Sequence, residues 1–485
     1  MKSGLTRRDF FKKSAVVAGA AAGLSLVHAP TILAAGPAPS GKVRVAVIGC
    51  GGQGGGTHLP NAAREQLVAV CDVSDSNISK NLEALAKKVP EANLGSVKKY
   101  YDYRKMFDEM GKDIDAISVA TPNHHHFLPA MIAMQLGKAA YVEKPLAHSV
   151  EQARQMAAAS LKYKAVTQMG NQGRSGEGYR RLCEYIWAGA IGNVTEVHCW
   201  TDRANGGAGP RPPTLPVPAG MHWDEWIGPS PARDYHKDLH PHEWHGWYDF
   251  GNGSLGNLAC HVMDGAVWAL KLKHPTSIEA EYILGGSNER YPVGDRLRYD
   301  FPARGNMPAV KVYWWDGKKP GTKTETKSEA KADGEDTVPT GSQNWPTVAT
   351  EWKQKTGLKL EGSGTIYIGD KGTMFTGCYG GGVTILPVEK MKEYKAPTPS
   401  IPRVKGGHFG NFYDAVRAGN PAAASSPFEV AAVLTEIVCL GNLAQKAGLG
   451  KKVLWDGPNM KCTNMPELNK LIQLQYRKGW APTAV

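Results

Sequence analysis

The chain has 485 residues, of which 42% are hydrophobic and 21% charged, a composition typical of a globular protein with room for two or three domains. Its formal net charge is +12, and residues 1–35 contribute +4 of it. Because no arginine-rich helix, zinc-finger spacing or aromatic-basic RNA motif accompanies this charge, we interpret it as a solvated basic surface rather than a nucleic-acid site. The eight cysteines include no C-x-x-C pair, so we expect no metal site of that kind.

The first 35 residues have the pattern of an export signal. Residues 6–12 read TRRDFFK, which resembles a twin-arginine motif, and the apolar stretch Ser14–Ala29 is shorter than the roughly 20 residues of a membrane-spanning helix. Ala34 and Ala35 offer small residues for cleavage. We therefore expect a periplasmic or otherwise exported protein without stable membrane insertion after cleavage; an uncleaved anchor or a chance arginine pair is the alternative. The twin-arginine route carries folded proteins, so a cofactor acquired in the cytoplasm would travel with the chain.

A Pro/Gly-containing linker, residues 36–41, precedes a regular alternation of strands and helices over residues 42–170. Each predicted strand is short and apolar, as in a parallel sheet that is covered on both faces. These strands are Val43–Ile48, Leu67–Cys71, Asp115–Val119, Ala139–Val142 and Ala165–Met169. One intervening helix should end at Gly137, and another should begin at Ser149 with Gln152 three residues on. The pattern predicts an α/β fold, a doubly wound Rossmann domain.

The pattern changes after residue 170. Strand-like segments now lie far apart and alternate only in part, and a second domain is expected over residues 171–450. Its predicted strands are Val194–Trp200, Ser277–Ile283, Ala309–Trp315 and Gly364–Ile368. A charged insertion, residues 317–347, is interpreted as a surface excursion. Residues 451–485 form a C-terminal extension.

A glycine-rich segment follows the first predicted strand. It contains Gly49, Gly51, Gly52, Gln53 and Gly54 and fits G-x-G-x-x-G. The motif is weak alone, but a preceding strand and a following helix are the context that supports it. Glycines let the backbone approach a pyrophosphate, and the helix N-terminus offers N–H donors and a positive dipole. The segment predicts a dinucleotide site.

An acidic residue, Asp72, ends the second predicted strand, eighteen residues after Gly54. A carboxylate there accepts hydrogen bonds from the adenosine ribose and repels a 2′-phosphate, so NAD is expected as cofactor rather than NADP. The alternative is that Asp72 only caps the loop that follows it.

Two further motifs follow the third and fourth strands: Thr121-Pro122-Asn123-His124-His125-His126 and Glu143-Lys144-Pro145. With the glycine motif, they make the chain resemble the Gfo/Idh/MocA oxidoreductases, the family of glucose–fructose oxidoreductase and inositol dehydrogenase. The resemblance covers essentially all of residues 42–450. It implies that the second domain is α+β with an open, largely antiparallel sheet, that a homo-oligomer forms through this sheet, and that the substrate lies between the domains.

The resemblance also implies roles for individual residues. Lys144 would reach the nicotinamide ribose and the reacting hydroxyl, and Glu143 would contact the cofactor. The loop under the nicotinamide matches Thr121, Pro122 and Asn123. His126 and Gln172 are expected to join the cofactor contacts.

A candidate base follows in the second domain. The family pattern there is Asp-x-x-x-His, and this chain has Asn257 and His261. A cation such as Lys144 favours the alkoxide of a secondary hydroxyl, and a histidine accepts its proton at neutral pH. We therefore expect Lys144 and His261 to be catalytic and Asn257 to position the substrate. Asp264 either supplies the missing negative charge or has a structural role.

A loop dense in histidine and tryptophan spans residues 236–249. Indole faces pack on sugar C–H groups and histidines bond hydroxyls, so His245 and Trp247 are expected to contact the substrate. Arg174, after the fifth strand, is expected to do the same. Interdomain packing is the alternative for the loop, and metal ligation has no diagnostic spacing to support it.

These features predict an NAD-dependent oxidoreductase that acts on a secondary hydroxyl of a sugar, polyol or glycoside. Because little free NAD exists outside the cytoplasm, the cofactor should be tightly bound and recycled in place. One alternative is redox-neutral, NAD-dependent glycoside cleavage by oxidation and elimination. A second is a non-enzymatic NAD- or sugar-binding protein.

Overall fold

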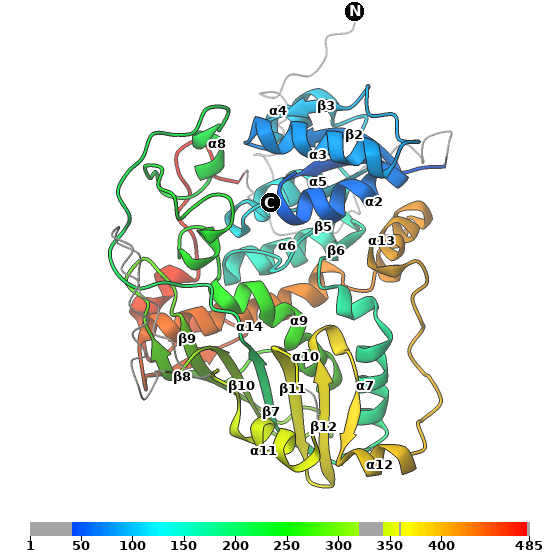
Figure 1. Ribbon diagram of the computed structural model, residues 1–485, viewed down its shortest axis with the longest axis vertical. Helices are drawn as coiled ribbons and strands as arrows, with labels where there is room; N and C mark the ends of the chain where they lie inside the picture. Colours follow the sequence, from blue (N-terminus) through cyan, green and yellow to red (C-terminus); the bar gives the residue numbers. More distant parts are fainter. Residues whose placement is uncertain (1–40, 320–342, 358–359, 483–485) are drawn as a thin grey trace, which may run out of the picture. The chain divides into compact units, whose positions relative to one another are not determined.

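The computed structural model describes residues 41–319, 343–357 and 360–482. The predicted export signal and linker, apart from Gly41, lie outside these residues, as does most of the insertion predicted at residues 317–347. Two sheets organise the described chain, and Figure 1 shows them at opposite ends of it with helices between.

The first sheet is a parallel six-stranded Rossmann sheet in the order β3-β2-β1-β4-β5-β6. Its strands are β1 (Arg44–Ile48), β2 (Gln66–Cys71), β3 (Lys98–Tyr100), β4 (Ala116–Val119), β5 (Ala139–Val142) and β6 (Thr167–Met169). All five predicted strands are confirmed. The missed strand β3 is short, polar and largely exposed at the sheet edge, so it lacks the apolar run that identifies the others. The strand order reverses between β1 and β4, where open α/β sheets bind ligands.

Helices connect these strands. They are η1 (Gly54–His58), α2 (Leu59–Arg64), α3 (Asp75–Lys88), α4 (Tyr103–Met110), η2 (Asn123–His125), α5 (Phe127–Gln135), α6 (Val150–Tyr163) and η3 (Gln172–Ser175). Gly137 follows α5 with φ +71°, as the predicted helix end requires. The Oγ of Ser149 accepts the N–H of Gln152 at 3.3 Å, which confirms the predicted start of α6.

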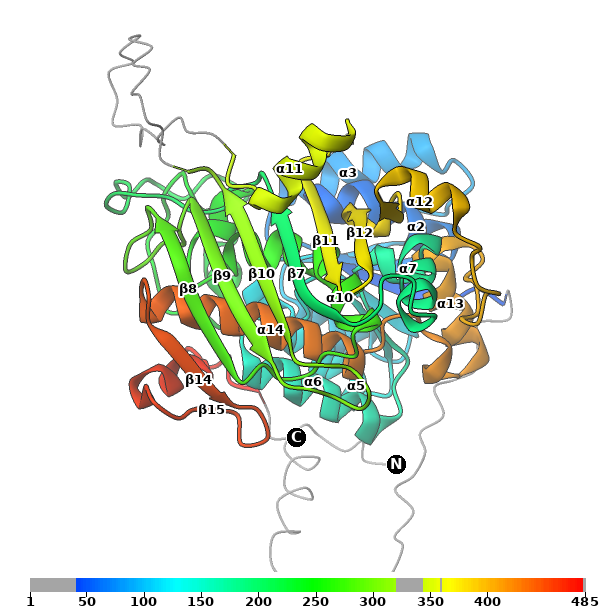
Figure 2. The ribbon, with the colours of Figure 1, turned by 90° about the horizontal axis from the view of Figure 1, so that it is seen from below.

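The second sheet is nine-stranded, in the order β13-β12-β11-β7-β10-β9-β8-β14-β15. Its strands are β7 (Val194–Thr201), β8 (Ser277–Leu284), β9 (Gly294–Phe301), β10 (Val310–Gly317), β11 (Ser363–Gly369), β12 (Gly372–Gly377), β13 (Thr384–Leu386), β14 (Lys452–Asp456) and β15 (Lys461–Cys462). Only β10 and β7 pair in parallel, so the sheet is mixed and mostly antiparallel. Figure 2 shows the strands β8, β9, β10, β7, β11 and β12 side by side in this order.

The four predicted strands of this domain are confirmed as β7, β8, β10 and β11. Five strands of this sheet, β9, β12, β13, β14 and β15, were not predicted. Of these, β9 alternates buried Leu297 and Tyr299 with charged Arg296 and Arg298. Those arginines are ion-paired with glutamates of β8, at 2.7–2.9 Å. The predicted C-terminal extension is not separate from the domain, because its strands β14 and β15 continue the second sheet beyond β8.

The remaining helices pack around the second sheet and between the sheets. They are α7 (Glu177–Trp187), α8 (Trp223–Ile227), η4 (Glu243–Gly246), η5 (Leu255–Ala259), α9 (Cys260–Val262), α10 (Asp264–Ala269), α11 (Thr347–Thr356), η6 (Cys378–Gly380), α12 (Val388–Glu393), α13 (Gly407–Ala418), η7 (Pro421–Ala423), α14 (Phe428–Ala447) and η8 (Pro466–Leu471).

Two late helices join the domains. Phe409 and Phe412 of α13 are buried in one hydrophobic cluster with Val45 and Val47 of β1, so α13 covers the Rossmann sheet although it lies far along the chain. The 20-residue helix α14 is apolar and long enough to cross a membrane, but most of it is buried inside the protein. It is a core helix, and its residues share one hydrophobic cluster with both sheets.

Candidate active site

Close contacts that only glycine permits shape the turn after β1. Gly49 has φ +90°, and a Cβ there would lie 2.5 Å from the carbonyl oxygen of Ala120 at the end of β4. A Cβ on Gly54 would lie 2.0 Å from the carbonyl oxygen of Gly49. The helical segment η1–α2 begins directly after this turn, so N–H groups and a positive dipole end lie there. The residues present therefore fit a dinucleotide pyrophosphate.

The predicted residues of the glycine motif do not all line the cavity. Gly49, Gly51, Gly52 and Gln53 line a cavity of about 510 Å³. Gly54 is buried and does not line it. The last glycine therefore acts by allowing the turn to close tightly.

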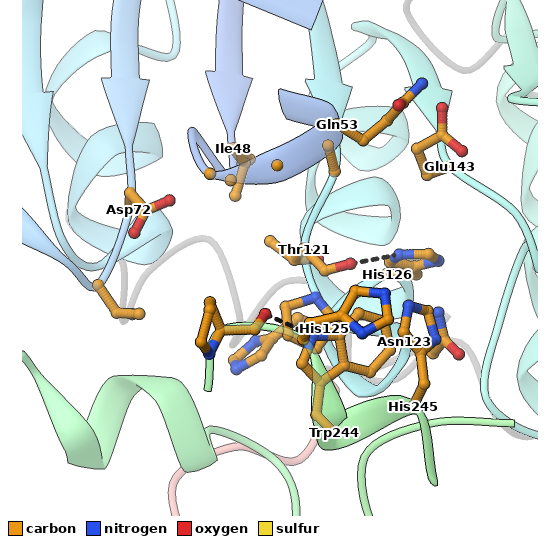
Figure 3. A pocket seen from close by; sticks show the side chains of 18 of the residues that line it. Ile48, Gln53, Asp72, Thr121, Asn123, His125, His126, Glu143, Trp244 and His245 are labelled. Atoms are coloured by element: carbon orange, nitrogen blue, oxygen red, sulfur yellow. Dashed lines mark hydrogen bonds between the residues drawn. The ribbon is translucent and has the colours of Figure 1, made fainter. Parts of the chain in front are cut away.

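Asp72 lines this cavity and lies directly after β2. Its carboxylate accepts the N–H groups of Cys50 at 2.6 Å and Ser74 at 2.8 Å, and an amide N–H of Asn77 at 3.3 Å. Burial raises the pKa of Asp72, and these hydrogen bonds partly offset the rise. Asp72 therefore does cap the loop that follows it, and it also lines the cavity. Figure 3 shows it across the glycine turn from Glu143.

The segment after β4 forms the floor of the cavity. Thr121, Pro122, Asn123 and His126 all line it, as predicted for the nicotinamide loop. The two ring nitrogens of His126 lie 2.7 Å from the carbonyl oxygen of Pro145 and 2.9 Å from that of Thr121, and the second contact is drawn in Figure 3. Burial lowers the pKa of His126 to about 4. The imidazole is thus neutral at physiological pH, and its single N–H donates to one of these two carbonyl oxygens at a time.

The neighbouring histidines also bind backbone. Nε2 of His124 and Nε2 of His125 each lie 2.9 Å from the carbonyl oxygen of Trp226. Within the described residues, no group of three histidine, cysteine or acidic side chains is arranged to hold a metal.

Glu143 and Lys144 follow β5 and enter the cavity from the first domain. Burial opposes ionisation of Glu143, but the hydrogen bond with His58 (3.1 Å) and nearby positive charges lower its pKa to about 2. Gly170 leaves room for this carboxylate, because a Cβ there would lie 2.6 Å from its Oε1. His58 was not foreseen from the sequence; it is fully buried on η1, and its other ring nitrogen lies 2.7 Å from the hydroxyl of Ser118.

Lys144 contacts the second domain. Its Nζ donates a hydrogen bond of 3.1 Å to Oδ1 of Asn257, and Nδ2 of Asn257 donates in turn to Oδ1 of Asn205 at 2.9 Å. Burial lowers the pKa of Lys144, and the charge of Glu143 partly offsets this. Asn257 therefore orients the ammonium group without neutralising it.

His261 lines the same cavity, four residues beyond Asn257. Its Nδ1 is buried and has no hydrogen-bond partner among the described residues, and its ring centroid lies 4.6 Å from that of Tyr379. Burial and the charge of Lys144 lower the pKa of His261 to about 3. The imidazole is therefore neutral at physiological pH, the form that accepts a proton. The cavity thus brings Lys144, Asn257 and His261 together with the predicted cofactor residues, including Gln172.

The expected substrate contact of Arg174 has to be corrected. Arg174 is buried and does not line the cavity; its guanidinium forms a 2.5 Å ion pair with Asp264 and lies over the ring of Trp268. Asp264 also accepts the amide N–H of Asn171 at 2.9 Å. Asp264 therefore pairs with Arg174 in the interior and is not a carboxylate partner of His261.

The expected contact of Trp247 also has to be corrected. Trp247 is fully buried, with Arg233 and Arg290 over its ring at 5.1 and 5.0 Å. The short helix η4 instead directs Trp244 and His245 into the cavity, where the two rings stack 3.6 Å apart. The sequence pointed to this loop and to His245, but to Trp247 instead of Trp244. The turn within the loop determines which of the two rings faces the cavity.

Other lining residues had not been foreseen. Tyr379 lines the cavity, remains 47% exposed and has φ +59°, an unusual conformation for a tyrosine. In the sequence, only its position before a run of glycines could have indicated that Tyr379 lies in a site. Arg203 and Trp480 also line the cavity, from a loop and from the C-terminal extension. Their sequence surroundings contain no pattern that indicates this place.

Two regions match known families. Residues 43–171 match the oxidoreductase family with an NAD-binding Rossmann fold, Gfo/Idh/MocA, and residues 199–283 match its C-terminal alpha/beta domain. Inositol 2-dehydrogenase of Pseudomonas fluorescens is 32% identical over 165 residues, which are 33% of this chain and 45% of that protein. A glycosyl hydrolase family 109 protein of Solibacter usitatus is 32% identical over 153 residues, 30% of this chain and 34% of that one. The aligned parts thus span less than half the length of these relatives.

Solved structures show the same fold. The WlbA dehydrogenase from Bordetella pertussis, in complex with NADH and UDP-GlcNAcA, has a TM-score of 0.53 at 13% identity and covers 86% of this chain and 99% of that one. The myo-inositol dehydrogenase from Lactobacillus casei, in complex with NAD(H) and myo-inositol, has a TM-score of 0.50 at 17% identity and covers 89% and 100%. Residues 43–171 and 199–283 are thus similar to the NAD-binding Rossmann domain and the C-terminal α/β domain of the Gfo/Idh/MocA oxidoreductases.

Proposed function

We propose that the protein is an NAD-dependent oxidoreductase that acts on a secondary hydroxyl group of a sugar, polyol or glycoside. The observation that carries this proposal is the meeting of Lys144, Asn257 and His261 in the cavity that the glycine turn and Asp72 also line. NAD held by the glycine turn and Asp72 would supply the hydride acceptor for this oxidation. The family relatives named for inositol dehydrogenation support the same substrate class.

Side chains of the cavity stabilise the charge on the substrate oxygen, remove its proton and contact the substrate. The ammonium of Lys144, held by the amide of Asn257, lies where it stabilises negative charge on the substrate oxygen. His261, neutral because burial lowers its pKa, takes the hydroxyl proton as the carbonyl forms. The carbon thus loses a hydride and the oxygen a proton, which balances the oxidation. Trp244 and His245 offer a ring face and a polar edge to the substrate.

Incubation of the purified protein with a panel of sugars and polyols, monitored by NADH absorbance, tests this function. Lys144→Ala should lower turnover by about 10²–10⁴-fold, the usual contribution of such a group. Lys162→Ala, which changes a lysine near the end of α6 that does not line the cavity, serves as the matched control. Full activity of Lys144→Ala would refute the assigned role.

Redox-neutral glycoside cleavage is the second candidate, and the similarity to a glycosyl hydrolase family 109 protein favours it. Here a hydroxyl is oxidised transiently, the resulting ketone acidifies the adjacent C–H, a leaving group is eliminated and the carbonyl is reduced again. His261 would serve as the base. Release of a free aglycone without net NADH formation distinguishes this reaction from net oxidation.

Export makes cofactor recycling part of the proposal. The twin-arginine-like residues 6–12 support a periplasmic or otherwise exported protein, in which NAD would have to be resident and be reoxidised or restored in place. Denaturing the purified protein should therefore release about one NAD(H) per chain. If NAD(H) is neither carried by the protein nor bound when it is added, a non-enzymatic sugar-binding protein becomes the better interpretation. We also propose a homo-oligomer through the second sheet, which sedimentation tests directly.

A further inference from the structure

Two segments that lie far apart in the chain meet beside the cofactor cavity. The first, residues 220–228, contains α8, and the second is residues 477–480. Both contribute to the lining: Glu225 and Trp226 come from the first segment, and Trp480 comes from the second. Residues 477–480 lie outside the two regions that match the family. This part of the cavity wall is therefore not explained by the matched domains.

The first segment is held on the loop that follows β2. The N–H of His222 donates to the carbonyl oxygen of Val73 at 2.8 Å. The N–H of Asp75 donates in return to the carbonyl oxygen of Gly220 at 3.0 Å. Val73 lines the cavity and directly follows Asp72, the residue expected to bind the cofactor ribose. The first segment therefore forms a wall of the cavity beside that acid.

The second segment packs on the start of α4, in the Rossmann domain. Cζ of Arg104 lies 3.7 Å from the ring centroid of Trp480, and its guanidinium donates to the carbonyl oxygen of Gly479 at 3.1 Å. The ring of Trp480 also meets those of Tyr103 and His125, at centroid distances of 6.1 and 5.8 Å. Both of these residues line the cavity, and Trp480 is only 5% exposed. Its indole is thus a packed part of the cavity wall.

Arg477 joins the two segments. Its guanidinium pairs with the carboxylate of Asp224 on α8 and donates to the carbonyl oxygens of Asp224 and Gly228 at 2.8 and 2.9 Å. The N–H of Trp480 donates to the carbonyl oxygen of Arg477 at 3.0 Å, so one turn connects this anchor to the indole. Neither Arg477 nor Asp224 lines the cavity. Their ion pair therefore acts on the position of the two segments and not on a bound molecule.

We propose that residues 220–228 and 477–480 form a clasp that retains the NAD cofactor, and that the contacts of Arg477 and Trp480 keep this clasp closed. The inference rests on the proposed NAD-dependent function and names the residues that keep the cofactor resident. NAD enters and leaves when the clasp detaches from the loop after β2 and from α4. Each contact that stabilises the closed clasp lowers the fraction of open molecules and so slows exchange.

Stopped-flow fluorescence of NADH, measured on the full chain without any sugar, tests the clasp. Arg477→Ala should speed the binding and the release of NADH by a similar factor, about 3–30-fold for the loss of a partly exposed ion pair with its hydrogen bonds. The Kd should stay nearly unchanged, because Arg477 does not line the cavity. Trp480→Ala also removes a ring from the cavity wall, so it should speed release more than binding and raise the Kd.

Arg417→Ala is the matched control. It removes an arginine of α13 that is ion-paired with Glu65 and Asp414, at 2.6 and 2.7 Å, and that does not line the cavity. Its rates should equal those of the wild type. Asp224→Ala breaks the same ion pair as Arg477→Ala from a side chain that is 70% exposed, so it should speed exchange in the same way even if Arg477→Ala folds poorly.

The possible outcomes separate the clasp from the proposed function. Equal NADH rates in the wild type, Arg477→Ala and Asp224→Ala would overturn the clasp and leave the oxidoreductase proposal standing. Faster release with an unchanged rate of binding in Arg477→Ala would also overturn it, because a clasp acts on both directions. A wild-type protein that does not bind NADH would overturn both proposals.

Discussion

Nζ of Lys144 donates a hydrogen bond of 3.1 Å to Oδ1 of Asn257, and this bond joins the end of β5 in the first domain to η5 in the second. The family pattern has an acid where this chain has the amide. Because an amide carries no charge, the buried ammonium is oriented but not neutralised, and its field also acts on His261. The identity of residue 257 therefore affects the electrostatics around both Lys144 and His261.

Asn257→Asp tests this relationship. A carboxylate 3.1 Å from Nζ should raise the pKa of Lys144 and that of His261, by about 1–3 units for a close opposite charge. Since His261 must be neutral to accept a proton, the acid limb of the kcat/KM profile should move to higher pH. Asn257→Leu removes the hydrogen bond without adding charge, so it should lower activity and leave the limb in place. If the acid limb of Asn257→Asp lies at the same pH as that of the wild type, His261 is not the base.

Asp72 should determine cofactor preference. Asp72→Ser removes both the ribose acceptor and the charge that repels a 2′-phosphate, so affinity for NAD should fall more than affinity for NADP. Asp72→Asn is the matched variant, because it removes the charge while keeping one acceptor oxygen, for the N–H group of either Cys50 or Ser74. Titration of NADH and NADPH fluorescence measures both affinities. Unchanged NAD affinity in Asp72→Ser would reject the assignment.

Buried histidines should make the fold sensitive to acid. Burial lowers the pKa values of His125, His126 and His408 to about 4, below the unfolded value of about 6.5. The unfolded chain therefore binds more protons between these values, so the contribution is complete above about pH 6.5 and is lost as the pH falls towards 4. Each histidine should account for on the order of 1–3 kcal/mol of unfolding free energy. Urea unfolding at several pH values should show the decline.

A pair of histidine variants separates this effect from general acid unfolding. His408→Gln should flatten the pH dependence of stability, whereas His242→Gln, at a side chain that is 60% exposed, should not. Equal slopes for wild type and His408→Gln would contradict the prediction.

The buried pair of Arg174 and Asp264 should be structural. Asp264→Ala leaves the guanidinium unpaired and should cost about 3–5 kcal/mol of stability, while the double change to Arg174→Met and Asp264→Leu should recover much of it. The acid limb of the kcat/KM profile, measured on the folded fraction of either variant, should remain at the same pH as in the wild type. A limb displaced by Asp264→Ala would instead make Asp264 an electrostatic partner of His261.

Much of the cofactor side of the site could be predicted from the sequence. The strand before Gly49, the acid at the end of β2 and the Glu143-Lys144 motif are local patterns, and parallel strands bring their carboxyl ends to one edge whatever the rest of the chain does. The cavity accordingly contains Asp72, Thr121, Asn123, Glu143 and Lys144. Among the strands that were not predicted, the short polar strand β3 and the charge-alternating strand β9 each lack a clear apolar pattern.

The substrate side depended on contacts between residues far apart in the chain. Arg174 and Asp264 both lie near catalytic segments, yet they are ninety residues apart and pair with each other in the interior. Trp244 faces the cavity and Trp247 faces the core because of one helical turn between them. The sequence by itself thus determined the Rossmann fold and the NAD motif, since periodicity and spacing are local properties. Only the tertiary structure decided which side chains of the second domain reach the cavity, because burial and pairing set those orientations.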